Sequence, residues 1–167
     1  MADEYDLLVD AFGRIRDTVA RSIDGLTSEQ LEFRPGGEAN SIAWLVWHLT
    51  RVQDDHVADA AGSEQVYTSA GWHERLALPF EADVTGYAMT SADVARVAGL
   101  SSARLLGYLN AVHDRTVEYL ATRPDLDRVV DANWKPPVTL AVRLVSVIGD
   151  DLQHAGQVGY AVGLLPA

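Results

Sequence analysis

The sequence predicts an all-α protein, folded as one four-helix bundle with a long connection between the second and third helices. Two observations predict this fold class. Four long segments carry apolar residues at steps of three and four, the period of a helix with one buried face, and no segment forms a convincing strand. The 167 residues suffice for one apolar core and are too few for two. Residues 1–167 are therefore expected to form a single domain.

The first helix is expected over residues 5–23. Apolar side chains recur along it at helical spacing: Tyr5, Leu8, Phe12, Ile15, Val19 and Ile23. It should end near Asp24-Gly25, because glycine adopts the left-handed conformation that closes a helix. The irregular stretch 26–39 follows, and within it Arg34-Pro35-Gly36-Gly37 is a strong break.

The second helix is expected to begin after Asn40 or Ser41, either of which is a good N-cap, and to run to about Ala61. Residues 62–89 show no sustained period, so we interpret them as a long connection. Connections of this length inside a compact domain are usually functional or carry short elements of their own.

The capping-box pattern Thr90-Ser91-Ala92-Asp93 predicts a short helix that stops near Gly99. The third long helix should start after Ser101 or Ser102, continue through apolar residues at helical spacing, and stop before Pro124.

A second loop, 125–135, leads to Pro136-Pro137. Prolines are accepted at a helix start because the first amides of a helix have no partner there. The last helix is expected over about residues 138–162. It is the most apolar of the four, so we expect neighbours to cover it on several sides.

Composition excludes several classes of partner. The net charge is −11 and the arginines form no basic stripe, so a nucleic-acid partner is not expected. The absence of cysteine rules out disulfides and thiolate ligands and suits a reducing compartment, so we expect a cytoplasmic protein. The acidic N-terminus has no apolar segment typical of a signal peptide. Apolar stretches are broken by charges well short of a membrane span, so no membrane partner is expected.

Three polar residues in apolar surroundings form a candidate metal site. Asp150 and His154 are four apart on the last helix, so they lie about 6 Å apart along its axis on nearly the same face. His48 stands in the middle of another apolar run, in the second helix. Helical bundles build metal sites from ligands on facing helices. His48, Asp150 and His154 could therefore hold one cation between two helices.

The same residues also have a simpler interpretation. An Asp and a His at this spacing often form only a solvated pair, and a histidine among tryptophans is often a satisfied core residue. Two details favour the metal. Gly149 and Gly156 flank the pair, although glycine weakens a helix, and small residues let a neighbour or a substrate approach. Burying Asp150 without a partner would also be strongly unfavourable.

Residues around this cluster are assigned roles in the same way. Asp151 is either an acceptor near the ligands or a solvated acid, and we favour the solvated acid. Gln157 and Gln153 could each orient His154 through its second ring nitrogen or face water. His56 shares a helix face with His48 but lies two turns further along. It could approach a second polar group with Asp55, but a surface role is expected.

The remaining histidines and the tryptophans are assigned structural roles. His113 precedes Asp114-Arg115 and is expected on a charged face, and His73 is expected at the surface or at the mouth of a pocket. The four tryptophans are expected in the core or in a pocket wall: Trp44, Trp47, Trp72 and Trp134.

Three stretches resemble the DinB-like superfamily: Arg34-Pro35, Asn40-Ser41-Ile42-Ala43-Trp44-Leu45-Val46-Trp47-His48-Leu49, and His154-Ala155-Gly156-Gln157. The resemblance covers almost the whole chain. It implies a bundle with one metal ion held by a histidine in the first half and two ligands, four apart, on the last helix. The commonest pattern has histidine at both of those last positions, and this sequence departs from it at Asp150. The mycothiol-dependent maleylpyruvate isomerases, a branch near the bacillithiol transferases, carry a glutamate there and bind zinc.

The resemblance implies a divalent metal, zinc first, although nickel, iron or manganese would suit the same ligands. It also implies a metal-dependent enzyme in which a low-molecular-weight thiol, such as mycothiol, takes part in S-transfer to an electrophile or in a thiol-assisted isomerisation. A non-catalytic metal- or ligand-binding bundle of the stress response is the alternative, and a metal-assisted hydrolase is the third. A homodimer is expected because bundles of this superfamily often pair.

Overall fold

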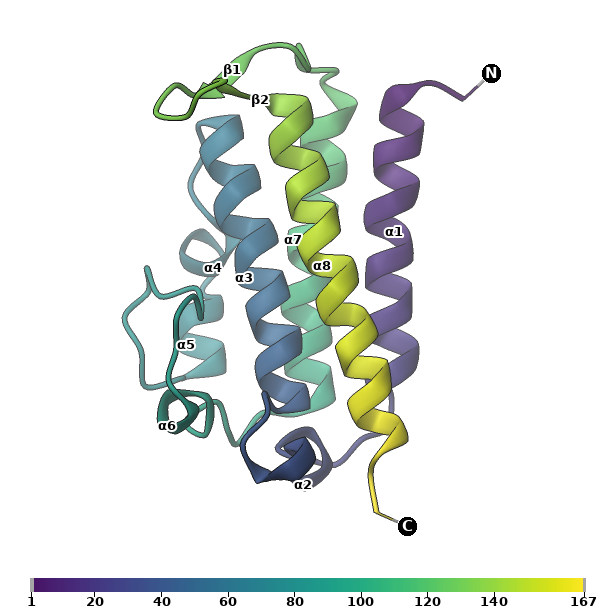
Figure 1. Ribbon diagram of the computed structural model, residues 1–167, viewed down its shortest axis with the longest axis vertical. Helices are drawn as coiled ribbons and strands as arrows, with labels where there is room; N and C mark the ends of the chain where they lie inside the picture. The colour runs from purple at the N-terminus through teal and green to yellow at the C-terminus, as the bar shows by residue number, and fades with distance from the viewer. Residues whose placement is uncertain (1, 167) are drawn as a thin grey trace.

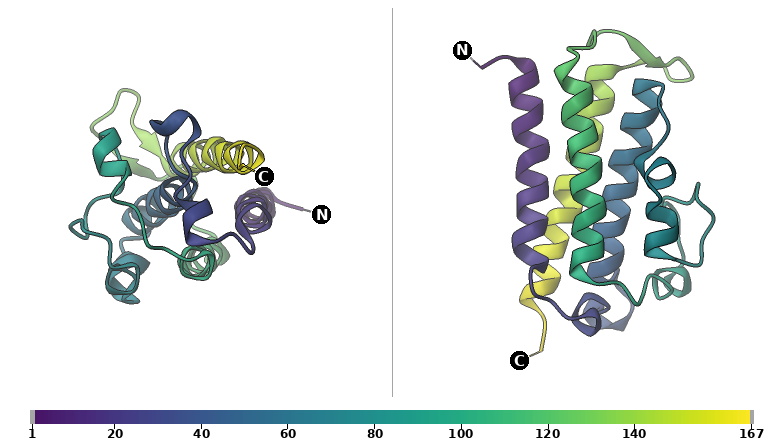
Figure 2. Two further views of the ribbon diagram at one scale, coloured as in Figure 1. Left: turned by 90° about the horizontal axis from the view of Figure 1, so that it is seen from below. Right: turned by 180° about the vertical axis from the view of Figure 1, so that it is seen from behind.

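The computed structural model describes residues 2–166, and four long helices form its bundle (Figure 1). Both α7 and α8 pack against α1 and α3, so α1 and α3 stand at opposite corners in the end-on view of Figure 2. The all-α prediction is confirmed. The bounds of the four helices are α1 Glu4–Ile23, α3 Ile42–Ala61, α7 Ser102–Ala121 and α8 Leu140–Gly163.

Side-chain caps explain where these helices begin. Ser41 accepts a hydrogen bond from the amide of Trp44, and Ser101 caps α7 in the same way. These two residues therefore decide the alternatives that the sequence left open. At the other end of α3, Gly62 takes a left-handed conformation with φ +65°.

Short elements occupy the stretches predicted to be irregular. Thr27 and Gln30 form a capping box at the start of one short helix, and Thr90 and Asp93 form another. In each, two side chains accept hydrogen bonds from backbone amides that would otherwise lack a partner. The helix predicted after Thr90 is present but shorter than expected. The bounds of the short elements are α2 Ser28–Leu31, η1 Pro35–Gly37, α4 Val66–Ser69, α5 Trp72–Leu76 and α6 Ser91–Val94.

The start of the last helix differs from the prediction. Strands β1 Val129–Asp131 and β2 Val138–Thr139 pair as a small antiparallel hairpin, and α8 begins only after them. The side chain of Thr139 accepts from the amide of Val142 and caps α8. Pro136 and Pro137 therefore lie in the hairpin turn, where their missing amide protons cost nothing, and not at the helix start.

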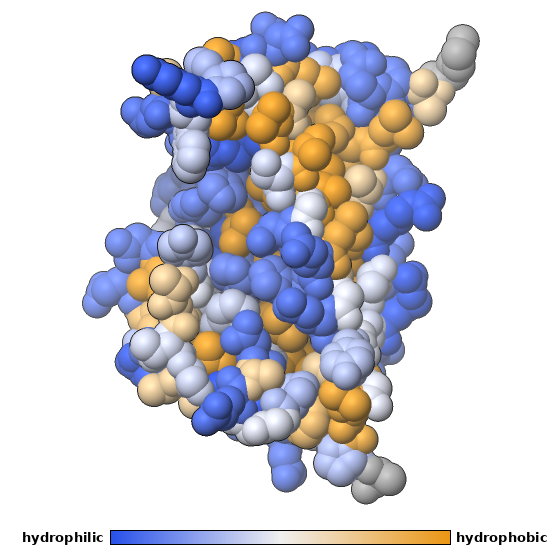
Figure 3. All heavy atoms as spheres, viewed as in Figure 1, coloured by the Kyte–Doolittle hydropathy of each residue, from blue (hydrophilic) through white to orange (hydrophobic). Residues whose placement is uncertain are grey.

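Helix α8 is also less covered than its composition predicted. Val142, Val145, Leu152 and Tyr160 are all exposed, and apolar side chains gather over the upper part of α8 in Figure 3. The side of α8 that packs against α1 and α3 carries its buried residues, among them Leu144, Val147 and Val158. None of the helices in residues 2–166 has the length and hydropathy needed to cross a bilayer.

His113 lies on the side of α7 that faces the protein core, and not on the predicted charged face. It is 6% exposed, and its Nδ1 has no hydrogen-bond partner. The prediction was wrong because His113 follows Val112 on the buried side of the helix, whereas Asp114 and Arg115 point outward. Burial, reinforced by the charge of Arg16, lowers the pKa of His113.

This burial makes stability depend on pH. A histidine in the unfolded chain has a pKa of about 6.5. At a pH below this value the unfolded chain binds a proton at position 113 more readily than the native protein does, because the native pKa is lower. The free energy of unfolding should fall as the pH drops below about 6.5, because the unfolded state then binds more protons. In His113→Leu the fall between about pH 7 and pH 5 should be smaller in urea titrations. A Val112→Ala control, destabilised without losing a titrating group, should keep the wild-type slope, and identical slopes in all three proteins would contradict the assignment.

Candidate metal centre

Helices α3 and α8 bring the three predicted residues together. One nitrogen or oxygen atom from each of His48, Asp150 and His154 lies within 4.8 Å of the others. The Asp150 Oδ1 atom is 3.8 Å from His154 Nε2, and the ring centroids of the two histidines are 4.9 Å apart. His48 is buried and the other two are partly exposed, so the cluster can be reached from solvent.

A backbone carbonyl sets the tautomer of His48. Its Nδ1 atom lies 2.7 Å from the carbonyl oxygen of Thr85. Since a carbonyl only accepts, Nδ1 carries the proton and donates, and the lone pair of Nε2 is left free for a cation. Burial lowers the pKa of His48, although the Thr85 hydrogen bond acts in the opposite direction. The ring is therefore neutral near pH 7, the form that binds a metal.

The residue after Thr85 packs directly on this ring. A Cβ atom on Gly86 would stand 2.7 Å from His48 Nδ1, and the backbone there has φ +99°. Only glycine fits this close approach and this conformation. Neither Thr85 nor Gly86 was predicted from the sequence, where a glycine inside an irregular connection is the only signal of this contact.

Gln157 sets the tautomer of His154, as the Thr85 carbonyl does for His48. Its Oε1 atom accepts a hydrogen bond from His154 Nδ1 at 2.8 Å, which again leaves Nε2 free. Gln153, the other candidate, donates to the carbonyl of Gly149 in its own helix. Trp44 stacks on His48 with ring centroids 4.5 Å apart and meets His154 edge-on, so it forms a wall of the cluster.

Asp150 has one oxygen that lacks a partner. Its Oδ2 atom is shut off from solvent and makes no hydrogen bond. A carboxylate oxygen in this state is unfavourable unless a cation or a donor approaches it. Together with two free imidazole nitrogens, this oxygen fits a divalent cation. The shorter side chain of aspartate, compared with the glutamate of the isomerase branch, still reaches the cluster.

A cavity of about 580 Å³ opens beside the cluster. His48 and Asp150 line it, and valines of α3, β2 and α8 supply apolar wall: Val52, Val138, Val142 and Val147. Trp134 of the hairpin turn lines it as the predicted pocket wall, although that side chain is exposed to solvent. The cavity has room for a small molecule next to the candidate metal centre.

His56 lines this cavity with a side chain that is 40% exposed, so the predicted surface position is compatible with a place in the cavity wall. Arg143 Nη1 donates to His56 Nδ1 at 3.0 Å, and burial followed by the Arg143 charge lowers the pKa of His56. Arg143 also lies 3.5 Å from an oxygen of Asp59 and 3.6 Å from one of Asp131. Among the described residues, Arg143 is the one arginine or lysine that lines the cavity, and other groups of the protein engage it.

Asp151 is buried, and the solvated role favoured for it was wrong. Its side chain is 0% exposed, and both oxygens lack a partner. Burial, with a smaller contribution from Asp150, raises the pKa of Asp151 well above its usual value. The helical stripe that Asp151 shares with Leu144 and Ala155 faces the core, and this periodicity was the signal that could have placed it.

A family model described as mycothiol-S-transferase matches residues 7–161. The chain belongs to the mycothiol-S-transferase family. The resemblance to DinB-like proteins is thereby confirmed, and membership implies a small-molecule thiol substrate. A solved structure described as the conserved protein of locus from Enterococcus faecalis has a TM-score of 0.89 to this chain at 29% identity, covering 97% of this chain and 96% of that one. No curated protein matches the chain.

The two glutamines of α8 give a matched test of the cluster. Gln157→Leu removes the acceptor that orients His154 and should weaken zinc binding about ten- to a hundredfold, because residues that orient a ligand have effects of this size. Gln153→Leu, on the same helix, should bind zinc like the wild type. Competition with a chromophoric chelator measures both affinities. Equal affinities in the two variants would mean that Gln157 does not act on a metal ligand.

Proposed function

We propose that this member of the mycothiol-S-transferase family is a metal-dependent enzyme that transfers the sulfur of a low-molecular-weight thiol to an electrophile. The observation that carries the proposal is the convergence of two histidines, each with Nδ1 engaged and Nε2 free, on a carboxylate with an unpartnered oxygen. His48, Asp150 and His154 would hold the cation. A divalent cation there would lower the pKa of a thiol or a water molecule in its open position.

Zinc is our choice among divalent metals. Two imidazoles and one carboxylate with an open position suit catalytic zinc. The same set also forms the facial triad of non-haem iron and accepts nickel or manganese. Because both histidines are oriented by fixed acceptors, the ligand geometry is prepared before a metal arrives.

The sulfur has to come from a cosubstrate, because the chain contains no cysteine. The cavity walls favour a thiol that carries hydrogen-bond donors. Asp55 and Asp131 line the cavity, and carboxylate oxygens accept hydrogen bonds. A polyhydroxyl thiol such as mycothiol would donate hydrogen bonds to them.

The family favours S-transfer over isomerisation, because the family model that matches the chain is described as mycothiol-S-transferase. In S-transfer the thiol loses its proton, a carbon–sulfur bond forms, and the leaving group departs with the electrons of its bond to carbon. The valines of the wall would keep bulk water from the electrophile, which limits competing hydrolysis.

Two features of the molecule's setting stay predictions. A homodimer would cover the exposed side chains of α8, among them Val145 and Leu152. A cytoplasmic location would supply the reducing environment in which a free thiol cosubstrate persists.

Metal content tests the ligand assignment. His48→Ala and His154→Ala should each lose stoichiometric zinc, because two remaining ligands hold a cation weakly, while helical content by circular dichroism stays largely unchanged. Asp150→His, which produces the commoner superfamily pattern, should retain the metal. Elemental analysis of the purified proteins measures this. Unchanged zinc in both alanine variants would refute the assignment.

Thiol consumption tests the activity. The zinc-loaded protein should deplete mycothiol in the presence of a haloaromatic electrophile, chelator should stop the reaction, and glutathione should react more slowly because it lacks sugar hydroxyls that could donate to the acids of the cavity. Free thiol is followed colorimetrically. Stabilisation by zinc without turnover would instead identify a binding bundle. Ester hydrolysis without any thiol would identify a hydrolase, and either result would overturn the proposal.

A further inference from the structure

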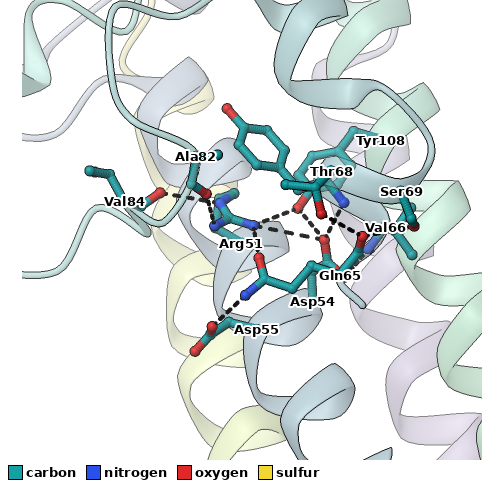
Figure 4. Close-up of polar contacts among 11 residues, drawn as sticks. Arg51, Asp54, Asp55, Gln65, Val66, Thr68, Ser69, Ala82, Val84 and Tyr108 are labelled. Carbon is teal, nitrogen blue, oxygen red and sulfur yellow. Dashed lines mark hydrogen bonds and ion pairs between the residues drawn. The ribbon is translucent and has the colours of Figure 1, made fainter. Parts of the chain in front are cut away.

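A buried polar network lies on α3 one turn beyond His48 and joins Arg51 and Asp54 to Gln65 and Tyr108 (Figure 4). It was not predicted from the sequence. Arg51 is its centre and is 0% exposed. The guanidinium donates to the carbonyl of Ala82 at 2.9 Å and to that of Val84 at 3.2 Å. It also donates to Gln65 Oε1 at 2.7 Å. Removing a charged group from water is costly unless its donors are satisfied, so these contacts hold the side chain in one place.

Asp54 forms the other half of this network. Its carboxylate accepts from the amides of Val66 and Tyr67, each at 2.8 Å, and from the hydroxyl of Tyr108 at 2.7 Å. Asp54 therefore anchors the start of α4 through hydrogen bonds to its first amides, whereas Arg51 anchors residues 82–84 through hydrogen bonds to their carbonyls. The two charges lie 3.8 Å apart and offset one another.

The segment that Arg51 holds runs directly into the candidate metal centre. The residue after Val84 is Thr85, whose carbonyl accepts the Nδ1 proton of His48, and Gly86 packs against the same ring. His48 and Arg51 are three apart on α3, so they lie on one face of the helix. Two side chains on one face of α3 therefore donate hydrogen bonds to three carbonyls of a single segment, those of residues 82, 84 and 85.

We propose that Arg51 is a positioning residue for His48: by holding the carbonyls of Ala82 and Val84 it fixes the Thr85 carbonyl, and with it the orientation and tautomer of the His48 ring. Its role for the metal rests on the proposed function, but its effect on the His48 ring does not. A fork of several fixed donors is needed to hold two carbonyls and an amide oxygen at once. Arginine supplies this fork and lysine does not.

The test compares Arg51→Lys with Tyr108→Phe. Lysine keeps the positive charge beside Asp54 but cannot hold both carbonyls, whereas Tyr108→Phe removes one hydrogen bond from Asp54 and one from Arg51 Nη1, at 3.3 Å, and leaves the contacts of Arg51 with the carbonyls of residues 82 and 84. Nitrogen-15 spectra of the histidine side chains, recorded on metal-free protein, report the tautomer. We expect His48 to carry its proton on Nδ1 in the wild type and in Tyr108→Phe, and to populate both tautomers in Arg51→Lys.

Zinc affinity gives the second readout. Arg51→Lys should bind zinc about tenfold more weakly than Tyr108→Phe, in line with other residues that orient metal ligands. Arg51→Gln, which is neutral and keeps one amide donor, replaces the lysine variant if that variant does not fold. A His48 spectrum like that of the wild type in the Arg51 variant, or the same change in Tyr108→Phe, overturns the proposal. Absence of zinc binding in the wild type would overturn the proposed function alone, because the spectra of metal-free protein still decide the role of Arg51.

Discussion

The hydrogen bond from His48 Nδ1 to the Thr85 carbonyl joins the bundle to the connection between its second and third long helices. The bundle alone would bring His48 near α8, but it would not decide which ring nitrogen carries the proton. The carbonyl decides it, and the free Nε2 then faces Asp150 and His154. A long connection without regular periodicity therefore has a definite chemical task, because it prepares one ligand for a cation.

Buried polar groups are divided between two tasks in this protein. Arg51 and Asp54 satisfy each other and the backbone of the connection, so their charges are compensated inside the fold. Asp150 Oδ2 and the free ring nitrogens are not compensated by the protein. The first pair holds the structure together, whereas His48 and Asp150 line the cavity, where a ligand can reach them.

The cavity presents hydrogen-bond acceptors beside the candidate metal centre. Among the described residues, three aspartates and one arginine line it, and that arginine is engaged by Asp59, Asp131 and His56. The carboxylates can accept hydrogen bonds from a ligand rich in hydroxyl groups. A divalent cation at the centre would offset part of their negative charge.

The sequence by itself determined the four helices, two candidate caps for each of the second and third, and the spacing of Asp150 and His154, because helical periodicity and capping are local properties of the chain. It also identified His48, since a histidine inside an apolar run stands out without any structure. Only the tertiary structure decided that Asp151 and His113 are buried, that Arg51 is enclosed, and that Thr85 and Gly86 contact His48. The helical period could indicate the face on which Asp151 lies, but only packing shows that this face is covered. The contacts of Arg51 with residues 82 and 84, and of His48 with residues 85 and 86, join positions more than thirty apart, and no local pattern encodes them.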